Sequence, residues 1–158
     1  MLYEWLQRPH VSEWWGDPET PDEVHEYCAL LTRPGSRDRA YVVMDGATPI
    51  GYIQSYAAKD SGAGWWPDEQ DPGARGIDQF IAEANWLGRG VGSAMVRAFV
   101  DRLFEDPAVT VVQADPDPGN ARAIRCYEKA GFVRVREVVT PDGPALLMIR
   151  RRVTTIQL

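Results

Sequence analysis

Cysteine is scarce in this sequence, because its 158 residues include only Cys28 and Cys126. Both lie in segments with helical patterning, and they offer neither a disulfide framework nor the spacing of a metal site. Long apolar runs are also absent, so the sequence predicts neither a secretory signal nor a membrane-spanning helix. We therefore expect a soluble, cytoplasmic protein with no bound metal and no membrane partner.

Positive charge is also in short supply. Lys and Arg number 17 against 23 Asp and Glu, which gives a formal net charge of −6. This balance argues against nucleic acid as a partner and fits a cationic one. The sequence contains no internal repeat or low-complexity tract, and its length predicts a single domain over residues 1–158. A monomer and a homodimer both remain open.

A glycine-rich stretch in the middle of the chain is the most informative feature. Gly88, Gly90 and Gly92 alternate along the sequence, and each would cost about 1 kcal/mol inside a helix. Residues 91–103 then show helical periodicity, and residues 76–82 read as a strand. A strand, a glycine loop and a helix N-terminus together favour an anion such as a phosphate. A glycine turn before an ordinary helix is the alternative interpretation.

The glycine spacing separates this loop from two well-known phosphate loops. No lysine follows the glycines, as a Walker loop requires, and Gly-x-Gly-x-Gly is not the Gly-x-Gly-x-x-Gly of dinucleotide sites. The stretch resembles the acetyl-CoA pyrophosphate loop of the GNAT N-acetyltransferase superfamily, Arg/Gln-x-x-Gly-x-Gly/Ala. Leu87 stands where Arg or Gln is usual. The departure is mild, because such a loop binds mainly through main-chain N–H groups.

A second motif follows at residues 120–132, which read Asn-Ala-Arg-Ala-Ile-Arg-Cys-Tyr-Glu-Lys-Ala-Gly-Phe. This run matches the superfamily signature Asn-x-x-Ala-x-x-x-Tyr-x-x-x-Gly-Phe. Asn120 can cap the helix, and Gly131 can end it in the left-handed conformation. Ile124 and Tyr127 share a helix face with Asn120. The two motifs imply the GNAT fold, an α+β (α/β) domain with a mixed, mostly antiparallel central sheet flanked by helices.

The other elements are predicted from capping and turn signals. Residues 1–6 look helical, whereas the superfamily usually opens with a strand, so that strand is absent here or lies upstream. Residues 10–16 are interpreted as an aromatic loop. Thr20 and Glu23 form a capping box for a helix that ends near Leu31. Strands are expected at residues 40–44, 50–57, 109–115, 133–140 and 145–150, with a long loop at 59–76.

The resemblance extends over nearly the whole chain to one GNAT branch, the aminoglycoside 6′-N-acetyltransferases. Its most specific signals are Glu-Trp-Trp-Gly at 13–16, Gly-Trp-Trp at 64–66 and Arg-Gly-Ile-Asp-Gln at 75–79. Residues 50–56, 104–107, 122–132 and 140–145 also match. The resemblance implies an enzyme that transfers acetyl from acetyl-CoA to the 6′-amine of aminoglycoside antibiotics and so confers resistance.

Acetyl-CoA is the cosubstrate that this resemblance implies. The residues expected to bind it are Ile81, Ala82, Leu87, Gly88, Arg89, Gly90, Val91, Gly92, Ser93, Asn120 and Tyr127. Attack on the thioester creates an oxyanion, which needs hydrogen-bond donors in fixed positions. Main-chain N–H groups at Ile81 and Ala82 are the expected donors.

Asp78 and Tyr127 are the catalytic candidates. A substrate ammonium with a pKa of about 10 must lose a proton before its nitrogen can attack, and a carboxylate can accept that proton directly or through water. Asp78 lies on the strand beside the cofactor loop and is the expected base. Tyr127 would protonate the leaving CoA thiolate, or only orient the sulfur, since a thiol pKa of about 8.5 makes thiolate a fair leaving group. A surface strand acid and a core tyrosine are the structural alternatives.

Acids and aromatic side chains suit aminoglycosides, which are polycations built from flat-sided sugar rings. By resemblance, the substrate-binding residues are Trp15, Gln54, Ser61, Trp65, Asp78, Asp115 and Asp142. Asp142 also lies at a turn, where aspartate is common for backbone reasons. Trp5 and Trp14 are interpreted as core residues. Ala63 stands where relatives carry aspartate, and this difference bears on which drugs are accepted.

Two other functions remain open at this point. One is a GNAT acetyltransferase for another amine, such as a protein N-terminus or a siderophore precursor. The joint presence of Trp15, Trp65, Asp78, Asp115 and Asp142 argues against it. The other is a non-catalytic CoA-binding domain, which would predict a damaged base or loop.

Overall fold

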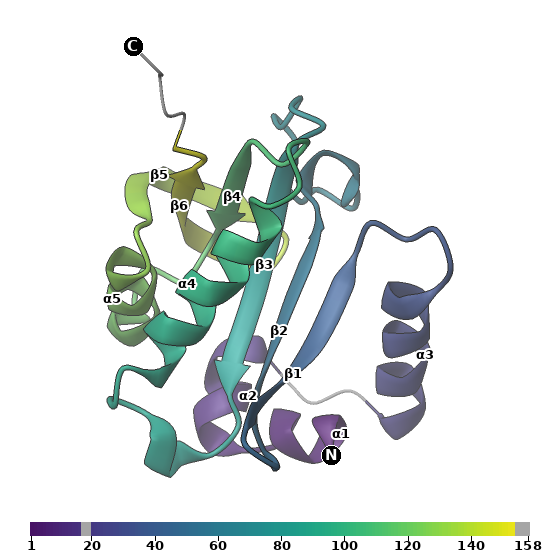
Figure 1. Ribbon diagram of the computed structural model, residues 1–158, viewed down its shortest axis with the longest axis vertical. Helices are drawn as coiled ribbons and strands as arrows, with labels where there is room; N and C mark the ends of the chain where they lie inside the picture. The colour runs from purple at the N-terminus through teal and green to yellow at the C-terminus, as the bar shows by residue number, and fades with distance from the viewer. Residues whose placement is uncertain (17–19, 154–158) are drawn as a thin grey trace. The chain divides into compact units, whose positions relative to one another are not determined.

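The computed structural model describes residues 1–16 and 20–153. Its helices and strands, in chain order, are α1 (Leu2–Leu6), α2 (Pro9–Trp15), α3 (Pro21–Thr32), β1 (Arg39–Asp45), β2 (Thr48–Ala57), η1 (Ala58–Asp60), β3 (Ala74–Ile81), η2 (Ala84–Trp86), α4 (Val91–Leu103), β4 (Val111–Ala114), α5 (Ala121–Lys129), β5 (Val133–Thr140) and β6 (Gly143–Arg151) (Figure 1). The strands form one sheet in the order β1-β2-β3-β4-β6-β5. The β3–β4 pair is parallel, whereas β1–β2, β4–β6 and β5–β6 are antiparallel. The predicted mixed, mostly antiparallel sheet is confirmed.

The chain divides into two compact units. The first unit contains Met1–Tyr56 and Asp78–Gly92, and the second contains Ala57–Ile77 and Ser93–Leu158. β3 therefore belongs to the second unit up to Ile77 and to the first unit from Asp78 onward.

An aromatic core holds the first unit together. Trp5, Tyr52 and Phe80 are buried, and Trp15 packs against them. The Tyr52 and Phe80 rings stack at 5.6 Å, while Trp15 meets Phe80 edge-on at 5.0 Å. Side chains two residues apart on a strand share a face. Asp78 is therefore on the Phe80 face of β3, directly beside this core.

The structure corrects the prediction for residues 10–16. Residues 10–15 are not a loop but form most of helix α2, which has Pro9 at a first-turn position that proline favours and Gly16 as its C-cap. Val11 and Trp15 are four residues apart, so they share the face that packs on the core. Trp14 lies off that face and is 38% exposed, so its interpretation as a core residue is wrong. The same interpretation is confirmed for Trp5, which is 4% exposed.

The predicted helix caps are confirmed. The Thr20 side chain accepts from the Glu23 N–H and the Glu23 carboxylate accepts from the Thr20 N–H, so the capping box starts α3. Asn120 accepts from the Ala123 N–H at 3.0 Å and caps α5. Gly131 follows that helix with a φ of +95°, a conformation that favours glycine.

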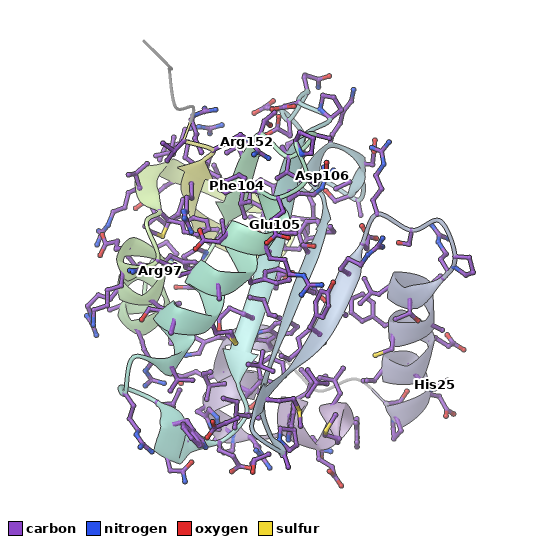
Figure 2. The ribbon with its side chains drawn as sticks, viewed as in Figure 1. His25, Arg97, Phe104, Glu105, Asp106 and Arg152 are labelled. Carbon is purple, nitrogen blue, oxygen red and sulfur yellow. The ribbon has the colours of Figure 1, made fainter. Side chains whose placement is uncertain are left out.

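In the second unit, β4 is shorter than the predicted 109–115. The Val109 N–H donates to the Asp106 carbonyl three residues earlier, in the connection that follows α4. The Thr110 N–H donates to the distant Gly73 carbonyl, next to the first β3–β4 pair, so Thr110 lies just before the start of β4. Arg152 stabilises this connection: its guanidinium lies 5.4 Å from the Phe104 ring centre and donates to the Val109 and Asp106 carbonyls (Figure 2). The predicted long loop is likewise shorter, because η1 occupies 58–60 and β3 begins at Ala74.

Both hairpins are observed where the sequence predicted them. β1 and β2 meet at residues 45–48, and β5 and β6 meet around Pro141 and Asp142, with Thr140 paired to Gly143. Neither Cys28 in α3 nor Cys126 in α5 forms a disulfide. Across residues 1–16 and 20–153, none of the helices has the length and apolarity needed to cross a membrane.

Candidate active site

Asp78 lies on β3 in the first unit, where its carboxylate is partly buried. Burial raises the pKa of Asp78 from 3.8 to about 6, while the hydrogen bond from Gln54 acts in the opposite direction. The Gln54 Nε2 donates to the Asp78 Oδ2 at 2.7 Å. A carboxylate with a pKa close to neutral is mostly ionised at pH 7 and yet takes up a proton more readily than an ordinary aspartate.

Gln54 is held by two tyrosines as well as by Asp78. The Tyr52 hydroxyl donates to the Gln54 Oε1 at 2.7 Å, and the Tyr27 hydroxyl donates to the same oxygen at 2.8 Å. Gln54 is only 4% exposed. The sequence reasoning missed both tyrosines. The Tyr52-x-Gln54 spacing could have suggested one shared strand face, but no local signal connects Tyr27 on α3 with this site.

Trp15, expected to contact substrate, lies next to the same group of residues. It is partly buried, and its ring meets that of Tyr52 edge-on at 6.0 Å. Tyr52 in turn leads through Gln54 to Asp78. The first unit thus connects Trp15, Gln54 and Asp78 through a continuous series of side-chain contacts.

The glycine loop connects η2 with α4. Gly88 and Gly90 have φ angles of +72° and +81°, and a Cβ added at either would meet no atom within 4 Å. Both glycines are therefore needed for backbone conformation rather than for room, and the space around them is open to a ligand. Arg89 stands over the Trp86 ring at 4.9 Å. The loop leads directly into the start of α4 at Val91, and the dipole of a helix favours an anion at its N-terminus.

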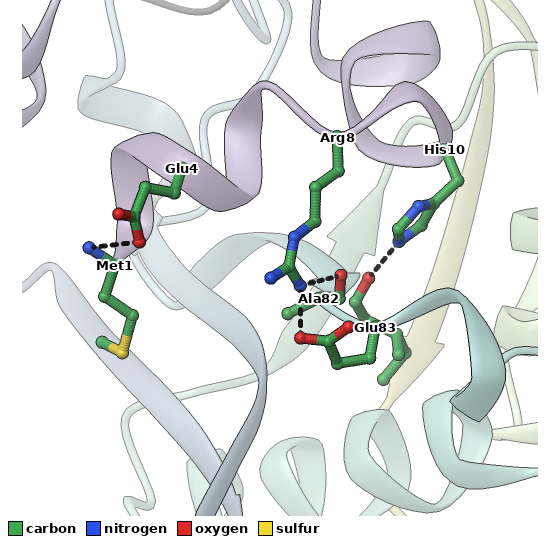
Figure 3. Close-up of polar contacts among 7 residues, drawn as sticks. Met1, Glu4, Arg8, His10, Ala82 and Glu83 are labelled. Atoms are coloured by element: carbon green, nitrogen blue, oxygen red, sulfur yellow. Dashed lines mark hydrogen bonds and ion pairs between the residues drawn. The ribbon is translucent and has the colours of Figure 1, made fainter.

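The end of β3 and the residues just after it are held by Arg8 at the start of α2 and by His10 in α2 (Figure 3). Arg8 donates to the Ala82 carbonyl at 2.6 Å and pairs with the Glu83 carboxylate at 2.7 Å. The His10 Nε2 lies 3.1 Å from the Ile81 carbonyl. A carbonyl can only accept, so this nitrogen carries the proton. The strand end that leads into the cofactor loop is thus fixed from outside the sheet.

The structure corrects the expectation that the main-chain N–H groups of Ile81 and Ala82 both donate to the oxyanion. The Ala82 N–H donates to the Ile50 carbonyl at 2.9 Å, so it is engaged within the sheet. Successive N–H groups along a strand point to opposite sides. The Ile81 N–H therefore points away from the side on which Ala82 meets β2, and it is the remaining candidate of the two.

Tyr127 and Asn120 lie in the second unit. Tyr127 is buried on α5, and its ring lies 5.2 Å from that of Phe132. Asn120 uses its side-chain oxygen to cap the same helix. The polar end of Tyr127 is thus carried by a helix that is fixed at its start and packed along its buried face.

The second unit also contains four of the residues expected to bind substrate. Ser61 donates through Oγ to the Ala58 carbonyl at 2.6 Å, and the Trp65 N–H donates to the Gly62 carbonyl at 2.9 Å. Asp115 follows β4 directly and is partly buried. Asp142 is exposed, and its N–H donates to the Thr140 hydroxyl at 3.2 Å. This bond uses the backbone of Asp142 and the side chain of Thr140, so the backbone preference for aspartate at this turn stays a prediction.

The predicted site residues fall into two groups. The first unit brings together Trp15, Gln54, Asp78, Ile81, Ala82, Leu87, Gly88, Arg89, Gly90, Val91 and Gly92. The second unit contains Ser61, Trp65, Ser93, Asp115, Asn120, Tyr127 and Asp142. Within the first unit, β3 carries Asp78, the candidate base, and ends at Ile81 a few residues before the glycine loop.

Comparison with known proteins is consistent with this geometry. The sequence profile of the acetyltransferase (GNAT) domain matches residues 1–140. An aminoglycoside N(6′)-acetyltransferase type 1 from Klebsiella pneumoniae is 53% identical over 155 residues, which cover 96% of this chain and 77% of that protein. A kanamycin resistance protein from Rhizobium radiobacter is 60% identical over 88 residues, 56% of this chain and 82% of that protein.

Solved structures give the same result. The acetyltransferase AAC(6′)-Ib in complex with paromomycin and acetyl-CoA has a TM-score of 0.89 and 52% identity, covering 96% of this chain and 86% of that one. Its complex with coenzyme A and kanamycin has a TM-score of 0.88 at the same identity, with 96% and 88% covered. The profile match and the identity both span most of the chain, and this protein belongs to the GNAT family of acetyltransferases.

Proposed function

We propose that this protein is an aminoglycoside 6′-N-acetyltransferase that uses acetyl-CoA and confers antibiotic resistance. The relatives that support this substrate are the Klebsiella enzyme and the kanamycin resistance protein described above. The cytoplasm is the proposed site of the reaction, because acetyl-CoA is available there. The acidic net charge of −6 suits a polycationic drug and disfavours nucleic acid.

One observation carries the proposed reaction, namely the carboxylate of Asp78 on β3. Its pKa of about 6 lies well above that of an ordinary aspartate, and the same strand leads within a few residues to the glycine loop. Asp78 would hold the substrate ammonium and accept its proton, directly or through a water molecule. The neutral amine can then attack the thioester carbon.

The glycine loop fits the pyrophosphate of acetyl-CoA. Open space beside Gly88 and Gly90, together with the start of a 13-residue helix, gives main-chain N–H groups access to an anion. The residues proposed to hold acetyl-CoA are Ile81, Ala82, Leu87, Gly88, Arg89, Gly90, Val91, Gly92, Ser93, Asn120 and Tyr127. When bound, acetyl-CoA supplies the thioester whose acetyl group is transferred.

Two further groups complete the proposed chemistry. The Ile81 N–H would donate to the oxyanion that forms on attack, because the Ala82 N–H is engaged with Ile50. Tyr127 would donate a proton to the departing thiolate or hold the sulfur in place. Holding the sulfur is sufficient if the thiolate leaves unaided, because a thiol with a pKa of about 8.5 gives a fair leaving group.

Acidic and aromatic residues are proposed to bind the drug. Asp115 and Asp142 would pair with its amines, and Trp15 and Trp65 would contact its ring faces. Ser61 is also proposed to bind the drug. Gln54 would act on the drug through Asp78, since its amide is buried and already bonded to that carboxylate.

The test is release of CoA thiol by the purified protein with acetyl-CoA and a matched pair of drugs. Neomycin carries an amine at the 6′ position, and paromomycin carries a hydroxyl there. Turnover with neomycin and kanamycin but none with paromomycin is expected, and it would establish both the reaction and its position. Equal rates with both members of the pair would contradict the 6′ assignment. Absence of turnover with any of the three, while acetyl-CoA still binds, would favour another amine substrate.

A further inference from the structure

The Gln54 amide makes an unusually complete set of contacts for a residue next to a candidate base. Its oxygen accepts from Tyr52 and Tyr27, and its nitrogen donates to Asp78. The three partners come from different elements, namely β2, α3 and β3. A side-chain amide at a surface would have no need for so many fixed partners.

The hydrogen-bond partners of Gln54 at both ends of its amide determine which way round the amide lies. A glutamine oxygen can accept two hydrogen bonds, and its nitrogen can only donate. An ionised carboxylate can only accept, so Asp78 requires the NH₂ group on its side. The two phenol O–H groups donate to the Gln54 oxygen at the other end and hold it there. If the amide turned over, its oxygen would face the carboxylate and its NH₂ group would face two hydroxyls.

We propose that Tyr27 and Tyr52 are positioning residues that hold the Gln54 NH₂ group against Asp78 and thereby favour the ionised form of this carboxylate. The tyrosines act through Gln54 rather than on the substrate. We call Tyr27, Tyr52 and Gln54 together the lock. Its importance for turnover rests on the proposed function, in which Asp78 is the base, whereas its effect on the ionisation of Asp78 does not depend on that function.

The hydrogen bond from Gln54 to Asp78 stabilises the ionised carboxylate in its buried surroundings. Burial penalises its negative charge, and the bond from Gln54 is the interaction that offsets this penalty. The titratable groups grouped around the network are Tyr27 and Cys28 from α3 and Tyr52 from β2. Burial raises the pKa of Tyr52 far above its ordinary value, so its hydroxyl remains a donor throughout the working pH range. Tyr52 therefore keeps its proton over the range in which Asp78 titrates.

Tyr27 makes this lock reach the molecular surface. It lies on α3 and is 37% exposed, whereas Tyr52 is 3% exposed and stacks on Phe80. Tyr52 is thus fixed by the core, and Tyr27 is fixed only as long as α3 remains in place. The position of α3 would consequently contribute to the ionisation of Asp78 on β3.

The experiment is a pH titration of the Asp78 side-chain carboxyl by ¹³C NMR on the full chain without substrate. The variants are Tyr27→Phe, Tyr52→Phe and the double variant, with Tyr41→Phe on β1 as the matched control. Removing both hydroxyls leaves the buried Gln54 oxygen without these two donors and lets the amide move away from Asp78. The pKa of Asp78 should therefore rise by about one unit in the double variant and by less in each single variant. The acid limb of the pH profile of kcat/KM should shift in the same direction, while Tyr41→Phe changes neither.

Gln54→Glu provides a second measurement with the opposite chemistry. It keeps the shape of the side chain but places a carboxyl group where the NH₂ donor was, so the two acids would have to share a proton. The pKa of Asp78 should then rise at least as far as in the double tyrosine variant. An unchanged Asp78 titration in Tyr27→Phe and in the double variant would overturn the proposal. If the double variant does not fold, Tyr27→Phe and Gln54→Glu decide the matter in its place.

The readouts also separate this proposal from the proposed function. If the pKa of Asp78 rises in the tyrosine variants as expected but the protein acetylates no aminoglycoside, the positioning role is supported and the proposed function is contradicted. Turnover that depends on Asp78, together with a titration that ignores both tyrosines, would do the reverse.

Discussion

Two aspartates, one in each unit, show how differently the same side chain can be placed. Asp78 in the first unit is partly buried beside an aromatic core, and burial raises its pKa to about 6. Asp71 in the second unit accepts from the Thr110 hydroxyl and from the Gly73 N–H at 2.7 Å, and these bonds lower its pKa. Neither shift requires a neighbouring cation as its main cause.

The difference follows from the balance between burial and hydrogen bonding. Donors stabilise a carboxylate and make it a poor proton acceptor, whereas burial with less compensation makes it a better one. Asp71 fastens the start of β3 to the turn before β4, where a Cβ added at Gly73 would collide with the Ala108 carbonyl. It is a structural acid. Asp78 has the properties of a reactive one.

The largest effect that tests this contrast is expected from Asp78→Asn. The amide has nearly the same shape but cannot take up a proton, so kcat/KM for kanamycin should fall about a hundredfold or more. Acetyl-CoA affinity, measured by calorimetry, should stay unchanged because the glycine loop is intact. Turnover close to that of the parent protein at every pH would contradict the role of base.

The pH dependence of the parent enzyme should show the same group. Below a pH of about 6 the Asp78 carboxyl is protonated and cannot accept another proton. We therefore expect kcat/KM to fall about tenfold for each pH unit below that value. This acid limb should be missing from the residual activity of Asp78→Asn. An acid limb that stays in place in this variant would belong to another group.

Asp71→Asn should have the opposite character, with little effect on chemistry and a measurable one on folding. The loss of the charged acceptor weakens its bonds to Thr110 and Gly73, so the free energy of unfolding should decrease by about 1–2 kcal/mol. Urea denaturation followed by circular dichroism measures this change. A large loss of kcat without a loss of stability would show that Asp71 is not a structural acid.

The parts of this comparison differ in how far the sequence could predict them. The glycine loop, the Thr20 and Asn120 caps and the two hairpins depend on residues close together in the chain, and their signals are local. Helix α2 also has a local signal, in Pro9 and the Val11–Trp15 spacing, but the neighbouring tryptophans hid it. Asp78 could be named because its position beside the loop, and its resemblance to a family motif, are visible in one short run.

The environment of Asp78 could not be predicted, because it is assembled from distant segments. Tyr27 comes from a helix that precedes β3 by many residues, and the hydrogen bond to Gln54 exists only once α3 lies beside the sheet. The engagement of the Ala82 N–H with Ile50 likewise depends on strand register, which the alternating pattern of residues near 80 does not determine. The identity of the base is thus local information, while its pKa is tertiary information.

The smallest expected effect is also the one that compares the two aspartates most directly, through the pH dependence of stability. Asp78 has a folded-state pKa above its ordinary 3.8, so the folded protein binds this proton more tightly than the unfolded chain does. Its contribution to stability should therefore improve as the pH falls from about 7 to 4. Asp71 has a lowered pKa, so its contribution is fully present above 3.8 and is lost as the pH falls below that value.

Urea denaturation of the parent protein and of both asparagine variants at pH 7, 5 and 3.5 would measure these contributions. The difference between parent and Asp78→Asn should shift in favour of the parent from pH 7 to 5, since the asparagine side chain of the variant cannot titrate. The difference between parent and Asp71→Asn should stay constant over that interval and shrink at pH 3.5. Parallel curves for the two variants would mean that burial and hydrogen bonding do not separate these aspartates. Opposite slopes would show that one fold has made one aspartate easy to protonate and the other hard.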